Sequence, residues 1–372
     1  MVKIAILRRE LGASFSMDVC ANGLAGGLKA VRPDWEVVAL APPVGALTSA
    51  NPWIKGLNKY YRRYWQYPRQ ARQCDADVFH IIDHSDGHLA YWLTKTNRPV
   101  VVTCHDLINF FQPDNIRDQA RLAAVSTAIW KYAVRGITKA DRIVTVSAHT
   151  ARDVVKLLAV DAQKITPVAN GVDPAFVSLP EEIGVIRARQ QLPADKFCLL
   201  HVGSNHPRKN VITVLKVLKT LLDQRLPVHL IKAGADFSAA QTAFIEENDL
   251  WGAIAHFSRP GKSTLVDLYN AADILLSPSC YEGFGITLLE AMACGTPVVT
   301  SNVTSLPEVV GEAGIMADPL DVAELSQVVR RLYEDVDHRN DLIQRGLKRV
   351  PRFTWAHSAE QVAQVYEKLL DL

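Results

Sequence analysis

Short apolar runs alternate with longer amphipathic stretches along the whole chain. In the first half these runs are residues 2–7, 36–41, 78–82, 100–103 and 142–146. Their length is typical of buried strands, and the stretch Met17–Val31 between the first two has helical spacing. Strands that alternate with helices predict a mostly parallel sheet with helices on both faces.

The second half repeats the alternation, with apolar runs at 197–202, 228–233, 255–257, 273–276 and 298–301. Between the halves, residues 167–174 form a cluster of turn residues. The length of 372 residues also suits two domains. The sequence therefore predicts an α/β fold of two Rossmann-like domains, residues 1–172 and 173–354, followed by an amphipathic helix over 355–372.

The most informative stretch lies at residues 281–297. The apolar run 273–276 ends at Pro278, and another begins at Val298, so a helix is expected between them. Leu, Ala and Met favour that helix from about Phe284 to Cys294, and Gly295 and Pro297 end it.

A glycine-rich loop at a helix start is suited to binding a phosphate. Free N–H groups and the helix dipole attract anions there, and Gly283 and Gly285 permit close approach because they lack a Cβ. Glu282 and Glu290 repel a phosphate but accept hydrogen bonds from hydroxyl groups. A ligand with both groups, such as a nucleotide sugar, is predicted. The alternative is that Glu282 only caps the helix while Glu290 lies on its solvated face.

The pattern Glu-x7-Glu with Gly-Phe-Gly inside it, followed by Glu-Ala-Met-Ala-Cys-Gly-Thr-Pro, resembles the donor-site signature of glycosyltransferase family 4. These are retaining enzymes of the GT-B fold, in which two Rossmann-like domains face each other across a cleft and the C-terminal helix crosses back to the first. The resemblance implies an acceptor-binding first domain and a donor-binding second domain. It assigns these residues to the donor: Glu282, Gly283, Phe284, Gly285, Ile286, Thr287 and Glu290.

A second loop at a strand end carries two adjacent cations. Residues 203–210 follow the run 197–202. Within them, Arg208 can donate hydrogen bonds to two phosphate oxygens at once, and Lys209 adds the compact positive charge of an ammonium group. No opposite charge lies nearby in sequence, and a solvated pair is the alternative. The loop resembles the family's Gly-x5-Arg-Lys-Asn segment, which implies that Gly203, Ser204, Arg208 and Lys209 grip the donor diphosphate.

In the first half, His105 and Asp106 follow the run 100–103. From spacing alone, a core histidine or a turn residue explains His105 as well as a functional role does. The resemblance makes it the active-site histidine that contacts the transferred sugar. Family members often have a Gly-Gly turn after the first strand near the donor; here only Gly12 matches it.

Residues 59–69 combine aromatic and basic side chains. An interfacial helix that inserts aromatic rings among anionic lipid headgroups has this composition, and so has a packed helix with a basic outer face. The packed helix is slightly favoured because the stretch is short and Pro68 is expected to end it.

Two patterns resemble metal sites, and neither predicts one. His80, His84 and His88 recur every four residues, but the strand expected over 78–82 would scatter them. The Asp75-Ala76-Asp77 triplet precedes that same strand, at the end opposite to the ligand side. The enzyme is therefore expected to need no metal and no cofactor.

Charge is uneven, since residues 1–172 hold 22 Lys and Arg against 14 Asp and Glu, while the remainder hold 19 against 25. A basic and an acidic half suit two domains with different partners. The six cysteines form no Cys-x-x-Cys pair, as in proteins with reduced thiols. No apolar run is long enough to cross a bilayer, so a cytoplasmic protein is predicted, with the inner membrane face as an option.

The combined prediction is a retaining, metal-independent hexosyltransferase that uses a nucleoside diphosphate sugar and a glycan, lipid or small-molecule acceptor, with no nucleic-acid partner. Catalytic roles fall to His105, Arg208, Lys209 and Glu282. A sugar-nucleotide epimerase of the same fold and a non-catalytic sugar-nucleotide binder are the alternatives. A nicotinamide dehydrogenase is disfavoured because no Gly-x-Gly-x-x-Gly follows the first strand.

Overall fold

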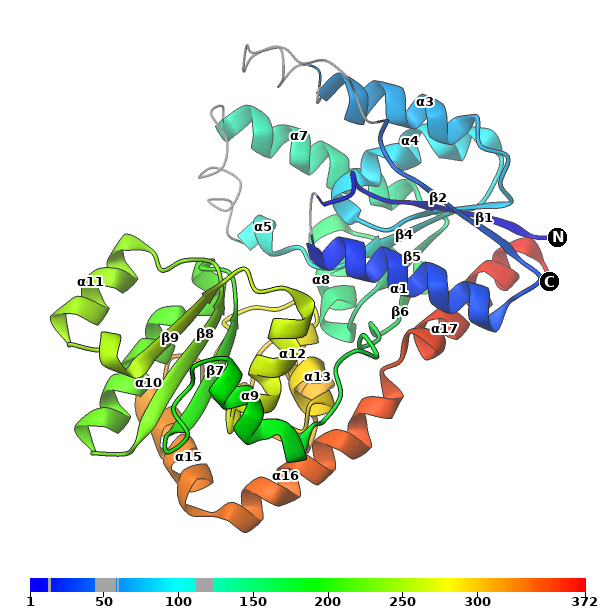
Figure 1. Cartoon of the computed structure of the whole chain (residues 1–372). Helices are drawn as coiled ribbons and strands as arrows, with labels where there is room; N and C mark the ends of the chain where they lie inside the picture. Colours follow the sequence, from blue (N-terminus) through cyan, green and yellow to red (C-terminus); the bar gives the residue numbers. More distant parts are fainter. Residues whose placement is uncertain (13–14, 44–57, 59, 112–122) are drawn as a thin grey trace. The chain divides into compact units, whose positions relative to one another are not determined.

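The computed structural model describes residues 1–12, 15–43, 58, 60–111 and 123–372 (Figure 1). The chain divides into two compact units. The first comprises Met1–Gly171 with Thr354–Leu372, and the second comprises Val172–Phe353. The chain passes from the first unit to the second after Gly171, one residue before the boundary that the turn cluster predicts.

The first unit is built on a parallel sheet in the order β2-β1-β3-β4-β5-β6. Its strands are β1 (Lys3–Leu7), β2 (Glu36–Leu40), β3 (Val78–Ile81), β4 (Val100–Cys104), β5 (Arg142–Thr145) and β6 (Ile165–Pro167). Its α-helices are α1 (Phe15–Val31), α3 (Tyr67–Arg72), α4 (Ala90–Leu93), α5 (Ile108–Phe111), α7 (Ala123–Arg135), α8 (Ala148–Leu158) and α17 (Trp355–Leu370).

Alternation along β1 divides the core of this unit into two layers. Ile4 and Ile6 pack with α1 and α17, whereas Ala5 and Leu7 belong to the cluster that includes α3, α4 and α7. Helices therefore cover both faces of the sheet, as the sequence predicts.

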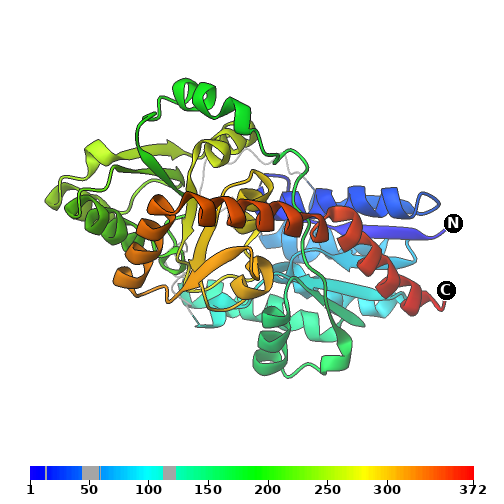
Figure 2. The same ribbon diagram turned by 90° about the horizontal axis from the view of Figure 1, so that it is seen from below.

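The C-terminal helix α17 lies beside α1 (Figures 1 and 2). Arg32, just after α1, binds Glu360 at 2.8 Å and Glu367 at 2.8 Å. The two helices approach so closely that a Cβ on Gly23 would lie 2.2 Å from the Trp355 ring. The last helix is thus an integral part of the first unit, which agrees with the expectation that it returns there.

The second unit has a parallel sheet in the order β12-β11-β10-β7-β8-β9. Its strands are β7 (Phe197–Gly203), β8 (Val228–Gly234), β9 (Ile254–Ser258), β10 (Ile274–Ser277), β11 (Val298–Ser301) and β12 (Gly314–Ala317). Its α-helices are α9 (Ile183–Arg189), α10 (Val211–Asp223), α11 (Ala239–Glu247), α12 (Lys262–Ala271), α13 (Ile286–Ala293), α14 (Leu306–Val310), α15 (Val322–Glu334) and α16 (Val336–Arg349).

Each sheet reverses its strand order once. The reversal lies between β1 and β3 in the first unit and between β7 and β10 in the second. In open parallel sheets, ligands bind outside the carboxyl ends of the strands at such a reversal. These two edges are therefore the places to look for a site.

One sequence expectation about helix ends is wrong. Pro68 does not end the aromatic and basic stretch: a π-helical turn, η1 (Arg62–Gln66), leads into α3, and Pro68 lies in the first turn of α3. The π-helical turn makes the proline tolerable, because the Tyr67 N–H bonds to Arg62 O and the next carbonyl oxygen, Arg63 O, bonds to His88 Nε2 instead.

Candidate active site

In the second unit, the loops that follow β7 and β10 bring three charged side chains together. Arg208 Nη1 lies 2.5 Å from Glu282 Oε2, and Lys209 Nζ lies 2.6 Å from Glu282 Oε1. The anionic partner that is missing near the two cations in sequence is therefore Glu282. Burial alone would raise the pKa of Glu282, but the charges of Lys209 and Arg208 outweigh it and lower that pKa to about 2.

Asn210 fixes the loop that carries the two cations. It has left-handed backbone angles, with φ 55° and ψ 41°, and precedes α10. Its buried side-chain amide donates to the carbonyl oxygens of Pro278, at 3.0 Å, and Pro319, at 2.7 Å. The Cys280 N–H also donates to Arg208 O at 2.8 Å. The loops after β7 and β10 are thus joined before any ligand binds.

Gly285 gives the start of α13 a backbone conformation that residues with a side chain rarely adopt. Gly285 has φ 107°, which favours glycine, and a Cβ there would lie 3.0 Å from Leu306. The Ser305 hydroxyl lies within hydrogen-bond distance of the Glu282 and Phe284 carbonyl oxygens, at 2.8 and 3.0 Å. Ile286 is the first residue of the helix, and Thr287 follows it, both partly exposed.

Gly203 is the last residue of β7, and the Lys209 side chain packs against its backbone. A Cβ on Gly203 would lie 3.2 Å from Lys209 Cδ and Cε. Ser204 follows, and its hydroxyl accepts from the His206 N–H at 3.4 Å. A side chain at position 203 would crowd the Lys209 side chain, so glycine is suited to this position.

Glu290 lies one turn before the end of α13. The Tyr269 hydroxyl donates to Glu290 Oε2 at 2.7 Å. Removal from water raises the pKa of Glu290 to about 7, although the hydrogen bond from Tyr269 opposes the rise. The two glutamates thus differ in charge at neutral pH, because Glu282 is fully ionised and Glu290 is half protonated.

His105 lies after β4 in the first unit and is buried. Its Nε2 lies 2.8 Å from Ile82 O. Since a carbonyl only accepts, Nε2 carries the proton, and Nδ1 of the neutral ring is left as an acceptor. Burial lowers the pKa of His105, which keeps the ring neutral. Such a ring can accept a hydrogen bond from a sugar hydroxyl.

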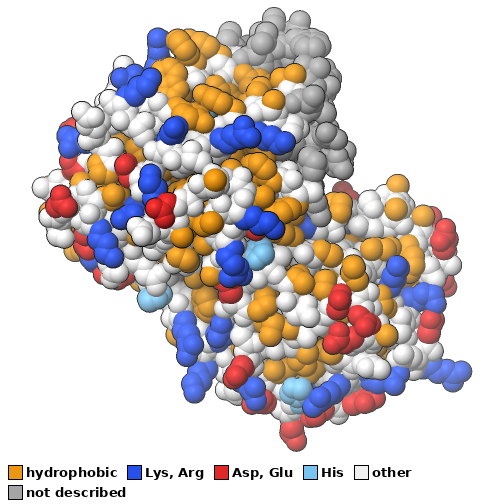
Figure 3. Space-filling model, turned by 180° about the vertical axis from the view of Figure 1, so that it is seen from behind, with side chains coloured by type: hydrophobic (Ala, Val, Ile, Leu, Met, Phe, Trp, Pro, Cys, Tyr) orange, Lys and Arg blue, Asp and Glu red, His pale blue; other side chains and the backbone are white. Residues whose placement is uncertain are grey.

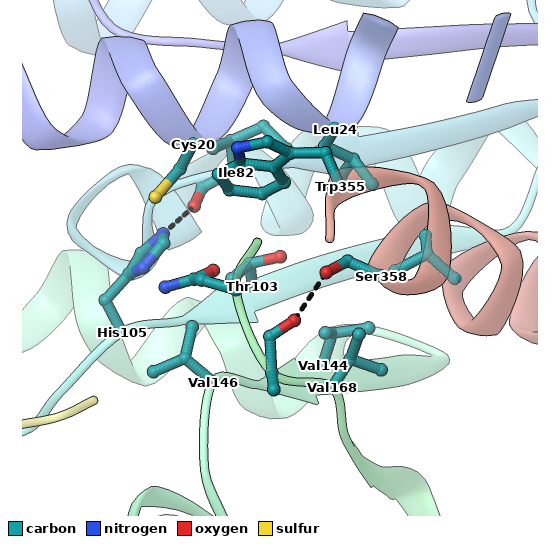
Figure 4. Close-up of a pocket in the computed structure, with 13 residues that line it drawn as sticks. Cys20, Leu24, Ile82, Thr103, His105, Val144, Val146, Val168, Trp355 and Ser358 are labelled. Carbon is teal, nitrogen blue, oxygen red and sulfur yellow. Dashed lines mark hydrogen bonds between the residues drawn. The ribbon is translucent and has the colours of Figure 1, made fainter. Parts of the chain in front are cut away.

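His105 borders a small, mostly apolar cavity of about 20 Å³ (Figure 4). Cys20 and Leu24 of α1 and Trp355 and Ser358 of α17 form part of its wall. The Ser358 hydroxyl donates to Ala169 O at 2.6 Å. The cavity has room for about one water molecule, so it is no sugar site by itself.

The reversal point of the first sheet holds a different ion pair. Arg9, after β1, lies 3.2 Å from Asp83, after β3. Burial opposes ionisation of Asp83, but His84 and Arg9 lower its pKa well below the usual range. Gly12, in the loop after β1, has φ 79° and donates its N–H to Asp18 at 2.9 Å.

The histidine repeat is scattered, as expected from the strand. His80 on β3 binds the Tyr366 hydroxyl at 2.5 Å and the Thr103 hydroxyl at 2.7 Å, whereas His88 binds Arg63 O at 3.0 Å. Asp77 accepts from the Lys3 N–H at 2.9 Å, at the amino ends of β1 and β3. In the part of the chain that the structure describes, no cluster of His, Cys, Asp or Glu is arranged to hold a metal ion.

The aromatic and basic stretch packs on one side and is exposed on the other. Tyr67 is fully buried and donates to Leu40 O at 2.8 Å, whereas Tyr61 and Trp65 are 51% and 42% exposed. Lys59 lies outside the described residues. No helix within the described ranges is both long enough and apolar enough to pass through a bilayer.

Two residues of this site, Tyr269 and Ser305, were given no role from the sequence, and Asn210 was predicted only as the last residue of the Arg-Lys-Asn segment. Each acts on a partner that is distant along the chain, such as Glu290, which follows Tyr269 by 21 residues. Only the strand order of the second sheet brings these partners together, and a single sequence gives no signal for it.

Comparison with known proteins identifies the family of this chain. A family model described as glycosyl transferases group 1 matches residues 183–349, and one described as glycosyltransferase family 4 matches residues 6–176. O-antigen chain mannosyltransferase B of Escherichia coli is 31% identical over 315 residues, which cover 82% of this chain and 78% of that protein. The chain belongs to the group 1 and family 4 glycosyltransferases, and it is a glycosyltransferase enzyme.

Solved structures show the same fold. Sucrose-phosphate synthase from Thermosynechococcus elongatus matches with a TM-score of 0.78 and 21% identity over 100% of both chains. Anabaena HepE in complex with UDP and glucose matches with a TM-score of 0.76 and 17% identity over 99% of this chain and 100% of that one. These likenesses confirm the predicted GT-B class of fold.

Proposed function

We propose that this enzyme transfers a hexose from a nucleoside diphosphate sugar to a hydroxyl group of a glycan, with retention of anomeric configuration. The observation that carries the proposal is the placement of Arg208 and Lys209 on one carboxylate at the reversal point of the second sheet. Two cations against one anion leave a positive charge where such folds bind ligands. A diphosphate supplies the matching negative charge.

The catalytic task is to stabilise the departing diphosphate while the sugar gains positive charge. Arg208, Lys209 and the N–H groups at the start of α13 are preorganised donors for that developing charge. Side-chain cations already at this place are the basis for proposing that the reaction needs no metal. Glu282 and Glu290 orient sugar and ribose hydroxyls, and His105 Nδ1 accepts from a hydroxyl of the transferred sugar. The acceptor hydroxyl attacks from the face that the diphosphate leaves.

Mannose is the first sugar to test, because the 31% identical relative is named a mannosyltransferase. That relative also directs attention to a polysaccharide acceptor. The test is incubation of the purified protein with GDP-mannose, UDP-glucose and ADP-glucose, each with short mannosides as acceptors. Product analysis by mass spectrometry and NMR gives the donor and the anomeric configuration. An inverted linkage, or turnover of none of these donors with any acceptor, would contradict the proposal.

We also propose a peripheral contact with anionic membrane, on the inner face where the protein would be cytoplasmic. Helices η1, α3, α4 and α7 contain no Asp or Glu, and they contain Arg62, Arg69, Arg72, Lys131 and Arg135, besides Arg63, which is paired with the buried Asp86 at 2.6 Å. Aromatic contacts join them, since Trp65 meets Trp92 at 5.6 Å and Tyr91 stacks on Tyr132 at 5.1 Å. Hydrophobic and basic side chains adjoin on the first unit (Figure 3).

This contact is tested by sedimentation with vesicles of phosphatidylglycerol and phosphatidylcholine. Binding that weakens between 50 and 500 mM salt, and that is lost in Trp65→Ser, supports it. Absence of binding at low salt would leave the packed-helix interpretation of this stretch.

A further inference from the structure

Lys232 is a lysine with no exposed surface, in the middle of the donor-binding unit's sheet. Its ammonium donates to Ala235 O and lies 5.2 Å from the centre of the Phe237 ring. Within the described residues it takes part in no ion pair. The negative charge of Asp236, whose side chain is 80% exposed, acts on the ammonium from beyond ion-pair distance. A buried cation with so little compensation costs stability, and that cost needs an explanation.

The position of Lys232 connects it with the candidate diphosphate site. Ala235, whose carbonyl it binds, donates its own N–H to Gly203 O at 3.3 Å. Gly203 in turn lies against the Lys209 side chain, and Lys209 binds Glu282. A continuous series of contacts therefore leads from the buried lysine to Lys209 and, through Glu282, to Arg208.

His201 lies near both Lys232 and Lys209, and near Glu282, which already binds Lys209. His201 of β7 pairs with Lys232 of β8 in the sheet register. His201 Nδ1 lies 3.0 Å from Leu276 O, so Nδ1 is protonated, and the buried Nε2 is an acceptor without a partner. Burial lowers the pKa of His201 to about 4, and the neighbouring lysines contribute, so the ring is neutral at physiological pH. His201 thus supplies no negative charge to Lys232, and Glu282, on the side of the site, is already paired with Arg208 and Lys209.

We propose that Lys232 is a positioning residue of the donor site, whose buried positive charge is compensated by the diphosphate of the bound nucleotide. This inference rests on the proposed function. In a medium of low dielectric constant, a unit charge still acts over about 10 Å, far more strongly than it would in water. The charge that costs stability in the free protein would then raise affinity in the complex. Burial lowers the pKa of Lys232 to about 8, although the charge of Asp236 opposes the fall.

The test compares Lys232→Met with the matched surface variant Lys216→Met, which removes a charge from the exposed side of α10. We expect Lys232→Met to have an unchanged or higher melting temperature, because the buried charge is gone. We expect it to bind GDP or UDP about tenfold more weakly, and the matching monophosphate with a smaller loss. Lys216→Met should bind both like the wild type. Calorimetric titration gives each affinity, and thermal denaturation gives each stability.

The pH profile separates a charge from a merely structural role. In the wild type, diphosphate affinity should fall as pH rises through about 8, as the ammonium loses its proton, and Lys232→Met should lack that fall. Equal losses for monophosphate and diphosphate, an unchanged diphosphate affinity, or a melting temperature several degrees lower would overturn the inference. If the wild type itself binds no nucleotide, the proposed function fails first, and that result is distinct.

Discussion

The two units each join basic and acidic side chains across the point where strand order reverses, and the balance of charge differs between them. In the first unit, one arginine faces one aspartate, Arg9 and Asp83, at 3.2 Å. In the second, Arg208 and Lys209 face the single carboxylate of Glu282, at 2.5 and 2.6 Å. The first pair is neutral, and the second group retains a positive charge.

This local balance is opposite to that of the whole sequence. Residues 1–172 carry the excess of Lys and Arg, and the remainder of the chain is acidic. A phosphate ligand responds to charges within a few ångströms, because salt screens exposed charges beyond about 10 Å. We therefore propose that the diphosphate binds to the acidic unit and a neutral, hydroxyl-rich ligand to the basic one.

Lys209→Ala should have the largest effect, because it removes one of the two preorganised cations. We expect kcat to fall by about 10²- to 10³-fold, as for loss of a group that stabilises developing charge. Lys219→Ala is the matched control, since that lysine pairs with Asp223 on the surface of α10. Activity of Lys209→Ala within a few-fold of the wild type, with the fold intact by circular dichroism, would contradict the assignment.

His105→Ala tests the first unit separately. Loss of one hydrogen bond to the transferred sugar should lower kcat by about 10- to 100-fold. The Kd of a nucleoside diphosphate should not change, because that ligand lacks the transferred hexose. Steady-state kinetics and calorimetry measure the two quantities. A weaker diphosphate complex in this variant would mean that the units do not divide the donor in this way.

Glu282→Gln should separate binding from catalysis. Removal of the carboxylate that both cations bind leaves two positive charges at the site, so a nucleoside diphosphate should bind about tenfold more tightly. Transfer should nevertheless slow, because the glutamate also orients the sugar. Weaker diphosphate binding in Glu282→Gln would show that the carboxylate does not compete with the ligand.

Glu290→Gln should abolish a pH dependence. The pKa of Glu290 is about 7 in the fold, against 4.5 for an ordinary glutamate. A carboxylate accepts hydrogen bonds from ribose hydroxyls better than a protonated carboxyl group does, so wild-type nucleotide affinity should rise several-fold from pH 6 to 7, below the range in which Lys232 loses its proton. The raised pKa also means that the free fold loses stability as pH rises from 4.5 to 7. For Glu290→Gln, the nucleotide affinity measured by calorimetric titration should be nearly constant from pH 6 to 7.

Addition of EDTA should have the smallest effect of all. If Arg208 and Lys209 supply the positive charge for the leaving diphosphate, chelation should leave the rate unchanged within error. Assays with and without EDTA, after extensive dialysis, measure this. A strict requirement for added Mg²⁺ or Mn²⁺ would contradict the metal-independent mechanism.

The positions of the strands could be predicted from the sequence, because each strand is a short run of consecutive apolar residues. The runs that predict β1, β7 and β10 end within one residue of the observed strands. The loops at their carboxyl ends were therefore identified correctly. The helix expected over 284–294 is α13, which is shorter because Gly285 adopts φ 107° just before it.

What the sequence could not provide is the pairing between distant loops. Arg208 and Glu282 are 74 positions apart, and their contact depends on β7 lying next to β10. The raised pKa of Glu290 likewise depends on burial beside Tyr269 of α12. Both features arise from tertiary packing, which hydrophobic periodicity does not encode.

The most direct test of the central claim is a crystal structure of the protein with a nucleoside diphosphate bound, using whichever of GDP, UDP or ADP binds most tightly. The account predicts phosphate oxygens on Arg208 Nη1 and Lys209 Nζ and ribose hydroxyls on Glu290. A diphosphate bound instead to Arg9 in the first unit would contradict it.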